Sequence, residues 1–536
     1  MASIDSNERY GVHEMVRGLH GSLQQYIEAQ YHIRDDGIIQ ERNALLQQPA
    51  VIAQRAYVEA TPVYLTEKGY VGLSIPKLAQ TVLRDIAALG DNVGLYPTPY
   101  RHQVDALEAF LGPEQDDLVV ATGTGSGKTE SFLMPLVATL AMESEERPKS
   151  RDLSGCRAIL FYPMNALVND QVARIRSLLG NKTVNALVAS GRSRPVRFGS
   201  YTGRTSYPGK RTSQKDAQNI APLFDEFYSK VQKNTLLRTK LEKMGRWPSK
   251  DLEAFYNEGV ATTTTVKTGG RAGKSHNLAN WKYRLLTQPG DRELMTRHEM
   301  QASCPDVLVT NYSMLEYMLM RPIESPLFEQ TTIWLNSDER NELILVLDEA
   351  HMYRGAGGAE VALLIRRLIA RLGISRDRVR CILTSASLGT DEQTRLDIVE
   401  FAKGLTGVTT NSKRKFRVVT ATKESRSGAA PATNNELNAL RMTNFEVIAD
   451  HALNPGGAVA AISKLAASLG WPTMIGDNLK DYLYATLTGF GPAELLIENV
   501  SGNATALDEL NSIIFPSTAS SNDKERALAR LFHKPL

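Results

Sequence analysis

Residues 117–136, DLVVATGTGSGKTESFLMPL, constrain the fold of this 536-residue chain more than any other stretch. A short apolar run at 117–121 leads into a glycine-rich loop, and a helical pattern starts directly after that loop. In this strand–loop–helix setting, backbone N–H groups of the loop and of the helix N-terminus can hold phosphate groups. The loop therefore predicts a nucleotide-phosphate site made of Thr122, Gly123, Thr124, Gly125, Ser126, Gly127, Lys128 and Thr129.

Two side chains at the end of this loop have expected chemical roles. The ammonium group of Lys128 can neutralise the β- and γ-phosphate oxygens, which makes it a candidate catalytic residue. The hydroxyl of Thr129 can bind Mg²⁺ beside the phosphates. Thr122 stands where such loops usually begin with glycine, and this difference argues against a kinase or a GTPase.

Further apolar runs alternate with helix-like segments and indicate a parallel sheet. The runs lie at 156–163, 185–190, 306–311, 343–350 and 380–387. Strands that are buried on both faces consist of continuous Val, Ile and Leu runs of this kind. The sequence therefore predicts an α/β fold whose parallel sheet carries helices on both faces.

The apolar run at 343–347 ends in Asp348 and Glu349, which supply the second half of a nucleotide site. A carboxylate at a strand end can hold Mg²⁺ through water, so Asp348 is a candidate metal ligand together with Thr129. Glu349 stands where it can polarise the attacking water, as phosphoryl transfer requires. The helical pattern that follows has one apolar face, which we expect in the core: Val361, Leu364, Ile365, Leu368 and Leu372.

Gln103 precedes Lys128 by about 25 residues and is a candidate for nucleotide selection. An amide side chain can bond both N6 and N7 of adenine, so Gln103 is expected to favour ATP. Downstream, the segment LTSASLG at 383–389 places two serines, Ser385 and Ser387, after a predicted strand. Taken alone, this serine pair carries no functional argument.

The length and the composition shifts indicate several structural regions, because 536 residues exceed what one core usually supports. We expect a helical accessory region at 1–93 and an α/β nucleotide-binding domain at 94–410. A linker at 411–436 and a mainly helical region at 437–536 would follow. Within the α/β domain, residues 203–300 interrupt the alternation of strands and helices and are predicted to be an insertion.

The predicted insertion is basic, with 18 Lys/Arg residues against 10 Asp/Glu residues. It contains a predicted helix pair at 219–244 and interleaved aromatic residues: Phe255, Tyr256, Trp281 and Tyr283. Basic residues interleaved with aromatic ones suit nucleic-acid contact, whereas a charge run is more often a solvated face. Both interpretations stay open for this insertion.

Composition also indicates the cellular compartment in which we expect the protein. No apolar run reaches the roughly 18 residues of a membrane helix, and no signal-peptide pattern opens the chain. Cys156, Cys304 and Cys381 lie far apart, each beside an apolar run. We expect buried thiols in a reducing, cytoplasmic setting, without a disulfide framework or a zinc cluster.

The order of the motifs resembles that of the DEAD/DEAH group of superfamily-2 helicases. Seven features match in order: Gln103 and the segments 122–129, 162–171, 200–205, 309–319, 348–351 and 384–388. The resemblance covers roughly residues 95–395 and implies a RecA-like domain of the P-loop NTPase type. The segments 310–322 and 348–368 resemble a bacterial branch of large DNA helicases in repair and anti-phage defence, including the DISARM and Druantia types.

The resemblance also implies roles for residues at matching positions. Ser385 and Ser387 would couple ATP hydrolysis to domain movement, although the family commonly has threonine where Ser387 stands. Three segments would contact the backbone of one DNA strand through Pro163, Asn165, Gln171, Thr202, Gly203, Arg204, Thr310 and Asn311. Backbone contacts position a strand without reading its sequence, so binding should be sequence-independent and sensitive to salt.

A motor of this group closes ATP between two RecA-like domains, and the second domain supplies an arginine finger. Residues 390–536 contain neither the Q-x-x-G-R-x-G-R signature of that domain nor enough predicted strands to build it. Because an arginine finger contributes about 10³–10⁵ in rate, we expect ATP binding with little hydrolysis and no unwinding by this chain alone. The simplest explanation is the N-terminal part of a longer helicase, or a chain that a partner completes.

Four functions stay open at this point. The first is the ATP-binding motor domain of a DNA helicase or translocase, with ATP, Mg²⁺ and DNA as ligands. The second is an RNA helicase, whose ATP chemistry is the same. The third is an ATP-gated nucleic-acid-binding subunit that does not unwind, and the fourth is a translocase that moves on duplex DNA without separating the strands.

Overall fold

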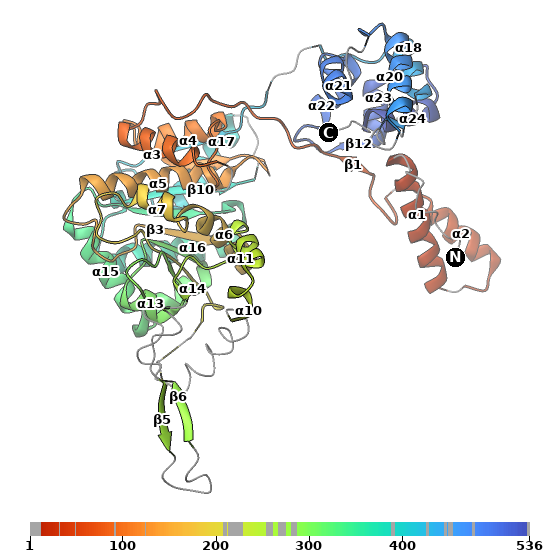
Figure 1. Ribbon diagram of the computed structural model, residues 1–536. Coiled ribbons are helices and arrows are strands. Elements are labelled where there is room, and N and C mark those ends of the chain that lie inside the picture. Colours follow the sequence, from red (N-terminus) through yellow and green to blue (C-terminus); the bar gives the residue numbers. More distant parts are fainter. Residues whose placement is uncertain are drawn as a thin grey trace. The chain divides into compact units, whose positions relative to one another are not determined.

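The computed structural model forms two compact units, one of residues 64–422 and one of residues 1–63 together with 423–536. Figure 1 shows the ribbon of the whole chain, coloured along the sequence. The described residues are all except 1–11, 32, 49, 91–92, 124, 207–208, 210–211, 213–228, 253, 255–260, 266–274, 280–286, 387–391, 425–427, 444–446, 449–453, 474–477 and 533–536.

The first unit is built on an eight-stranded sheet, and every pairing in it is parallel. In spatial order the strands are β11 (Phe416–Thr420), β2 (Asp117–Ala121), β10 (Val379–Ser385), β9 (Leu343–Leu347), β3 (Ala158–Tyr162), β8 (Val307–Asn311), β4 (Phe198–Tyr201) and β7 (Glu293–Leu294). The expected runs at 117–121, 156–163, 306–311, 343–350 and 380–387 supply β2, β3, β8, β9 and β10. The predicted α/β fold with a parallel sheet is confirmed.

The strand expected at 185–190 is wrong, because this segment belongs to helix α7 (Lys182–Val188). The side-chain oxygen of Asn181 accepts hydrogen bonds from the N–H groups of Thr183 and Val184 and starts the helix there. Val184 and Val188, four residues apart, are both buried in the core on one side of the helix. A short apolar run does not distinguish a helix from a buried strand by its pattern alone.

Three strands were not expected, and each lies toward an edge of the sheet. β11 pairs with β2, and its residues are mostly half-buried, so it lacks the fully apolar run of a central strand. β4 has four residues and β7 has two, and β7 pairs with β4 at the opposite edge. Short strands of this kind leave no clear signal in the sequence.

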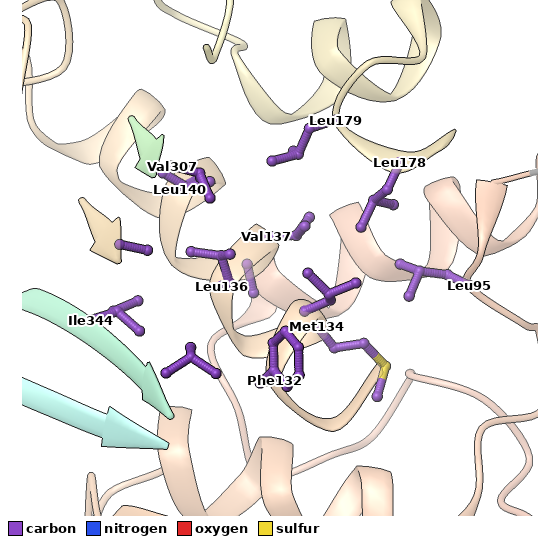
Figure 2. Packing of buried hydrophobic residues seen from close by; sticks show 14 of the residues in the cluster. Leu95, Phe132, Met134, Leu136, Val137, Leu140, Leu178, Leu179, Val307 and Ile344 are labelled. Carbon is purple, nitrogen blue, oxygen red and sulfur yellow. The ribbon is translucent and has the colours of Figure 1, made fainter. Parts of the chain in front are cut away.

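Helices cover both faces of the sheet, and alternate residues of each strand point to opposite faces. One face packs against α3 (Lys77–Ala87), α4 (Arg101–Leu111), α5 (Lys128–Glu146), α6 (Asn165–Leu178) and α7. Figure 2 shows the centre of this layer, where Phe132, Leu136 and Val137 of α5 lie among residues of the strands and of neighbouring helices.

The other face packs against α13 (Arg297–Ala302), α14 (Tyr312–Met320), α15 (Ser325–Ser337), α16 (Gly355–Leu372) and α17 (Glu392–Thr406). The apolar face predicted for the helix after Glu349 is confirmed, because all five of its residues are buried on α16. The remaining turns of this layer are 3₁₀ helices: η4 (Pro322–Glu324), η5 (Ala350–Met352) and η6 (Arg376–Arg378).

The predicted insertion contributes α10 (Ser229–Gln232), α11 (Thr235–Lys243) and an antiparallel pair of strands, β5 (Ala261–Thr265) and β6 (Ser275–Ala279). The two helices fall within the helix pair expected at 219–244, of which residues 219–228 lie outside the described part. The interleaved aromatic residues Phe255, Tyr256, Trp281 and Tyr283 also lie outside the described residues.

The second unit is mainly helical. Its elements are α1 (Val12–Gln30), α2 (Asp36–Leu46), β1 (Tyr57–Val58), α18 (Asn434–Met442), α20 (Pro455–Leu469), α21 (Leu479–Leu487), α22 (Gly491–Val500), β12 (Thr505–Ala506), α23 (Leu507–Ile514) and α24 (Ser521–Phe532). β1 and β12 pair antiparallel and join the N-terminal segment to the C-terminal helices of this unit. Their apolar residues form a separate core.

The units divide at positions that differ from the expected boundaries at 93 and 410. Residues 64–93 belong to the α/β unit because α3 buries Leu83 and Ile86 in the same core as α5. β11 extends that unit to residue 422. Within the expected linker, Ala432 is buried in the helical core, and its N–H donates to the carbonyl oxygen of Ile514 over 2.7 Å.

The buried thiols expected from the sequence are present in the structure. Cys156, Cys304 and Cys381 are free and buried, and burial raises the pKa of the Cys381 thiol to about 12. None of the helices that the structure describes is long and apolar enough to cross a membrane.

Candidate functional site

Residues expected to bind ATP, to hold Mg²⁺ and to couple hydrolysis to movement lie at the carboxyl ends of three neighbouring strands. Thr122 comes directly after β2, Asp348 comes directly after β9, and Ser385 ends β10, which lies between those two strands. Ligands of open α/β sheets bind at this edge, outside the carboxyl ends of the strands. The order of the strands therefore brings together segments that are more than 200 residues apart in sequence.

Hydrogen bonds within the phosphate-binding loop fix its conformation. The hydroxyls of Thr122 and Ser126 are 2.6 Å apart, and the Ser126 hydroxyl donates to the carbonyl oxygen of Gly123 over 2.8 Å. Gly125 and Gly127 have φ angles of 75° and 73°, a region that only glycine enters without strain. Thr124 lies outside the described residues.

Helix α5 begins at Lys128, directly after Gly127, so its N-terminus ends the loop. The unpaired N–H groups and the helix dipole give this end a partial positive charge that suits a phosphate group. Thr129, which is expected to bind Mg²⁺, is buried in the first turn. The loop and the start of α5 thus have the geometry that the sequence predicts for holding phosphate groups.

Gln103 contacts the loop from helix α4. Its Nε2 donates to the carbonyl oxygen of Gly127 over 3.0 Å, and its Oε1 accepts from the N–H of Tyr100 over 2.9 Å. One N–H and one oxygen lone pair of the amide remain, which are the two groups that a bidentate contact with adenine needs. Gln103 therefore lies beside the loop, as its expected role requires.

His102 is a further residue at the loop, and the sequence reasoning missed it. Its Nε2 lies 2.8 Å from the carbonyl oxygen of Ser126, and burial lowers the pKa of the imidazole. Its ring stacks on Tyr100 with the centroids 5.5 Å apart. Its place next to Gln103 in the segment YRHQ is the signal that could have identified it.

The DEAH segment faces the loop across the end of the sheet. Lys128 Nζ lies 3.4 Å from Glu349 Oε1, and both side chains are largely shielded from solvent. Glu349 has a φ of 51°, a left-handed conformation that is uncommon for a residue with a side chain. Backbone strain of this kind occurs where a site over-determines the position of a side chain.

Asp348 is positioned by a residue that the sequence reasoning did not single out. Oδ1 of Asp348 accepts a short hydrogen bond from the Thr384 hydroxyl and a second bond from the Glu349 N–H over 3.1 Å. Burial raises the pKa of the Asp348 carboxyl, and the Thr384 hydrogen bond opposes that rise. Thr384 directly precedes Ser385 in the segment LTSAS, and this position is the signal in the sequence that points to it.

His351 connects the DEAH segment to Ser385. Its Nδ1 lies 3.3 Å from Glu349 Oε2 and 3.4 Å from the Ser385 hydroxyl. Ser385, which ends β10, therefore contacts the DEAH segment through His351. Ser387 lies outside the described residues, so its expected coupling role has no structural counterpart here.

The residues expected to contact a DNA strand follow the next three strands along the same edge, β3, β8 and β4. Asn311 Nδ2 donates to Asn165 Oδ1 over 2.7 Å, which connects the segments after β8 and β3. The Thr310 hydroxyl donates to the carbonyl oxygen of Tyr201 over 2.7 Å, which connects the ends of β8 and β4. The three segments therefore form one continuous edge.

The other residues of these segments differ in exposure. Thr202 is buried, and its hydroxyl accepts from the N–H of Arg204 over 3.2 Å in the turn after β4. Gly203 and Arg204 are exposed at the tip of that turn, whereas Pro163 and Gln171 are half-buried. Among the described residues, no group of three or more His, Cys, Asp or Glu residues could hold a metal ion without other ligands.

Comparison with known proteins gives a family match and a relative of high sequence identity. The family described as DEAD/DEAH box helicase matches residues 100–203. The Druantia protein DruE of Escherichia coli (strain UMEA 4076-1) is 57% identical over 517 residues, which is 95% of this chain and 28% of that protein. The chain therefore spans about 28% of the length of this relative.

Two more distant matches were also found. An uncharacterized ATP-dependent helicase of Methanocaldococcus jannaschii, MJ1574, is 27% identical over 113 residues, 21% of this chain and 15% of that protein. The crystal structure of the DUF1998 helicase MrfA bound to DNA matches 81% of this chain and 44% of that chain at 15% identity, with a TM-score of 0.34. A TM-score at this level is too low to support an argument about the site.

Proposed function

Because residues 100–203 are a DEAD/DEAH box helicase domain, which implies a binding site for ATP, we propose that this chain carries the ATP-binding motor domain of a DNA helicase or translocase. The observation that carries the proposal is the pairing of Lys128 with Glu349, 3.4 Å apart and 221 residues apart in sequence. A lysine of a phosphate-binding loop beside the carboxylate of a DEAH segment is the arrangement that phosphoryl transfer to water needs.

The residues of the site have separate roles in ATP hydrolysis. Lys128 and the N–H groups at the start of α5 hold the β- and γ-phosphates. Phosphate oxygens compete with Glu349 for the Lys128 ammonium, so nucleotide binding frees the Glu349 carboxylate. That carboxylate then orients the attacking water and accepts its proton.

Mg²⁺ would be held by Thr129 and Asp348. Both hydrogen bonds described for Asp348 go to Oδ1, which leaves Oδ2 as the oxygen for a metal-bound water. An ion held there would supply positive charge that neutralises the phosphate oxygens. Thr384 keeps the Asp348 carboxylate in one orientation for this purpose.

We propose that the edge formed by β3, β8 and β4 contacts the backbone of one DNA strand. Thr310, Asn311 and Asn165 are already connected by hydrogen bonds there, and Arg204 is exposed beside them to meet a phosphate. Contacts of this kind carry no sequence information, so binding should be sequence-independent. Similarity to a Druantia protein supports a role in anti-phage defence over a role in repair.

Fast hydrolysis would need a second RecA-like domain, which supplies an arginine finger worth about 10³–10⁵ in rate. In the part of the chain that the structure describes, the α/β sheet of residues 64–422 is the only parallel sheet. That second domain would belong to the same longer protein or to a partner. The buried, free cysteines suit a cytoplasmic protein.

The test is ATP hydrolysis by this chain with single-stranded DNA, duplex DNA or RNA of the same sequence. We expect Mg·ATP binding, slow hydrolysis, and stimulation by DNA over RNA. Glu349→Gln should bind ATP and accumulate in the bound state. A chain that fails to bind Mg·ATP contradicts the proposal, and stronger stimulation by RNA favours an RNA helicase. ATP-dependent DNA binding without any hydrolysis favours an ATP-gated binding subunit.

A further inference from the structure

A strongly basic segment stands on the surface of the α/β unit. Residues 230–246, which span most of α10 and α11, contain six Lys/Arg residues and one Glu, a net charge of +5. The whole chain has a net charge of only +3, so the rest of the chain is slightly acidic. All six cationic residues are exposed: Lys230, Lys233, Arg238, Lys240, Lys243 and Arg246. We call residues 230–246 the basic segment.

Three acidic residues of the insertion, Asp291, Glu293 and Glu299, are paired with basic residues outside this segment. Lys250 Nζ lies 2.5 Å from both Asp291 Oδ2 and Glu299 Oε1, and all three side chains are buried. Glu293 accepts two hydrogen bonds from Arg176, at 2.6 and 2.8 Å. Each of these carboxylates is neutralised at the base of the insertion. These three carboxylates therefore do not neutralise the basic segment.

Within the basic segment, the single acid offsets one arginine. Arg238 Nε donates to Glu242 Oε1 over 3.0 Å, one helical turn away. Helix α11 buries none of its residues, so its cationic side chains face solvent along its whole length. Lys233, Lys240 and Lys243 are three of the exposed charges that an external anion can reach.

The basic segment is fixed to helix α6 at its C-terminal end. Gly245 is buried with a φ of 62°, and a Cβ there would lie 2.2 Å from the carbonyl oxygen of Ala173 on α6. Arg176 of α6 donates to the carbonyl oxygen of Gly245 over 3.2 Å. The Trp247 side chain is buried, and the Arg238 guanidinium lies 5.5 Å from the centre of its ring. These contacts fix the C-terminal end of the basic segment against α6.

Helix α6 connects the basic segment to the edge of the sheet that is proposed to contact a DNA strand. Helix α6 begins at Asn165, whose Oδ1 accepts from Asn311 Nδ2 at the edge formed by β3 and β8. The same helix thus carries a residue of the proposed strand path at its start and the anchor of the basic segment in its last turns. A nucleic acid bound along this edge is longer than the edge. It therefore continues beyond the edge in both directions.

We propose that the basic segment binds the phosphate backbone of duplex DNA next to the tracked strand; this proposal rests on the proposed function. The side chains on offer are lysines and arginines, which bind phosphates without reading the sequence. Single-strand sites add exposed aromatic rings on which bases stack. Among the described residues of 229–252, the one aromatic residue is Trp247, and it is buried. Duplex backbone therefore fits the segment better than unpaired bases do.

The test compares two variants that each remove three positive charges. Lys233→Gln, Lys240→Gln and Lys243→Gln together alter the basic segment. Lys68→Gln, Lys77→Gln and Lys149→Gln together are the control, because these lysines are equally exposed on the same unit. Fluorescence anisotropy gives the affinity for a short blunt duplex and for oligo(dT) across a series of salt concentrations, and calorimetry gives the affinity for Mg·ATP.

We expect the basic-segment variant to lose about fivefold in duplex affinity per lysine at about 0.15 M salt, since each phosphate contact contributes about 0.9 to the salt slope. Three contacts give a loss on the order of 10²-fold and a salt slope smaller by about 2.7. Affinities for oligo(dT) and Mg·ATP should match those of the control. Duplex binding equal to that of the control overturns the inference, as does an equal loss for duplex and oligo(dT). Failure of the unaltered chain to bind Mg·ATP counts against the proposed function instead.

Discussion

Replacing Thr384 with valine should weaken Mg·ATP binding without a change of shape in the core. The Thr384 side chain is fully buried at the end of β10, and its hydroxyl donates to Oδ1 of Asp348. The variant removes that donor and leaves the Glu349 N–H as the remaining described donor to the carboxylate. Because a hydrogen bond to a charged group contributes about 1.5–3 kcal/mol, we expect Mg·ATP affinity to fall about tenfold to 150-fold.

The pH dependence of binding should change in a defined direction. Burial raises the pKa of Asp348, and the Thr384 hydroxyl opposes that rise by favouring the ionised form. A protonated Asp348 cannot serve as a metal ligand, so Mg·ATP affinity falls as pH falls through this pKa. Loss of the hydroxyl raises the pKa further, and the fall in affinity should therefore begin at a higher pH in the variant.

The assay is isothermal titration with ATP, with and without Mg²⁺, at several pH values. Thr384→Ser is the matched control, because it keeps the hydroxyl and should bind Mg·ATP almost as the unaltered chain does. ATP without Mg²⁺ should bind equally to all three proteins. In an Asp348→Asn background, Thr384→Val should add little further loss, since the two residues act as a pair. Equal Mg·ATP affinity in Thr384→Val and the unaltered chain would refute this reasoning.

Two further predictions concern the loop and the opposite edge of the sheet. Gly127→Ala should weaken ATP binding about tenfold by fluorescence titration, because the left-handed conformation costs about 1–2 kcal/mol and a Cβ would lie 2.3 Å from Gln103 Nε2. Gly203→Ala, where a Cβ meets no atom within 4 Å, is its control and should bind ATP normally. Asp306→Asn should lower the free energy of unfolding in urea by about 3–5 kcal/mol, because it removes a buried charge that Arg157, Arg192 and Arg194 share. Burial alone raises the pKa of Asp306, but Arg194, Arg157 and Arg192 hold it well below its usual range. The ionised carboxylate therefore stabilises the fold above the pKa of an unfolded aspartate, and this stabilisation is lost as pH falls through the folded-state pKa. Below about pH 4, the unaltered chain should accordingly lose stability more steeply than Asp306→Asn does, and equal slopes would speak against this assignment.

The sequence predicted the elements whose signal is local. The central strands are continuous apolar runs, so β2, β3, β8, β9 and β10 could be identified, and the loop before Lys128 has a recognisable spacing. The likeness to DEAD/DEAH helicases and to the Druantia branch is confirmed by the family match and by the relative that is 57% identical. Motif order alone supported both conclusions.

What the sequence did not predict depends on contacts between distant residues. Thr384 matters because β10 lies beside β9, and no local pattern shows that neighbourhood. His102 contacts the loop from another helix, and its bond to Ser126 O is visible only in the folded chain. The segment at 185–190 was mistaken for a strand because a four-residue spacing and a continuous apolar run look alike over so few residues.

The pairing of Lys128 with Glu349 is the central claim, and calorimetry of Mg·ATP binding to two variants tests it most directly. Nucleotide binding must separate the pair, which as a partly shielded ion pair contributes up to about 1 kcal/mol. Glu349→Gln should therefore bind Mg·ATP up to about fivefold more tightly than the unaltered chain, whereas Lys128→Met should bind it at least about tenfold more weakly. Opposite shifts are the predicted result. Weaker binding in both variants, or no change in either, would contradict the account.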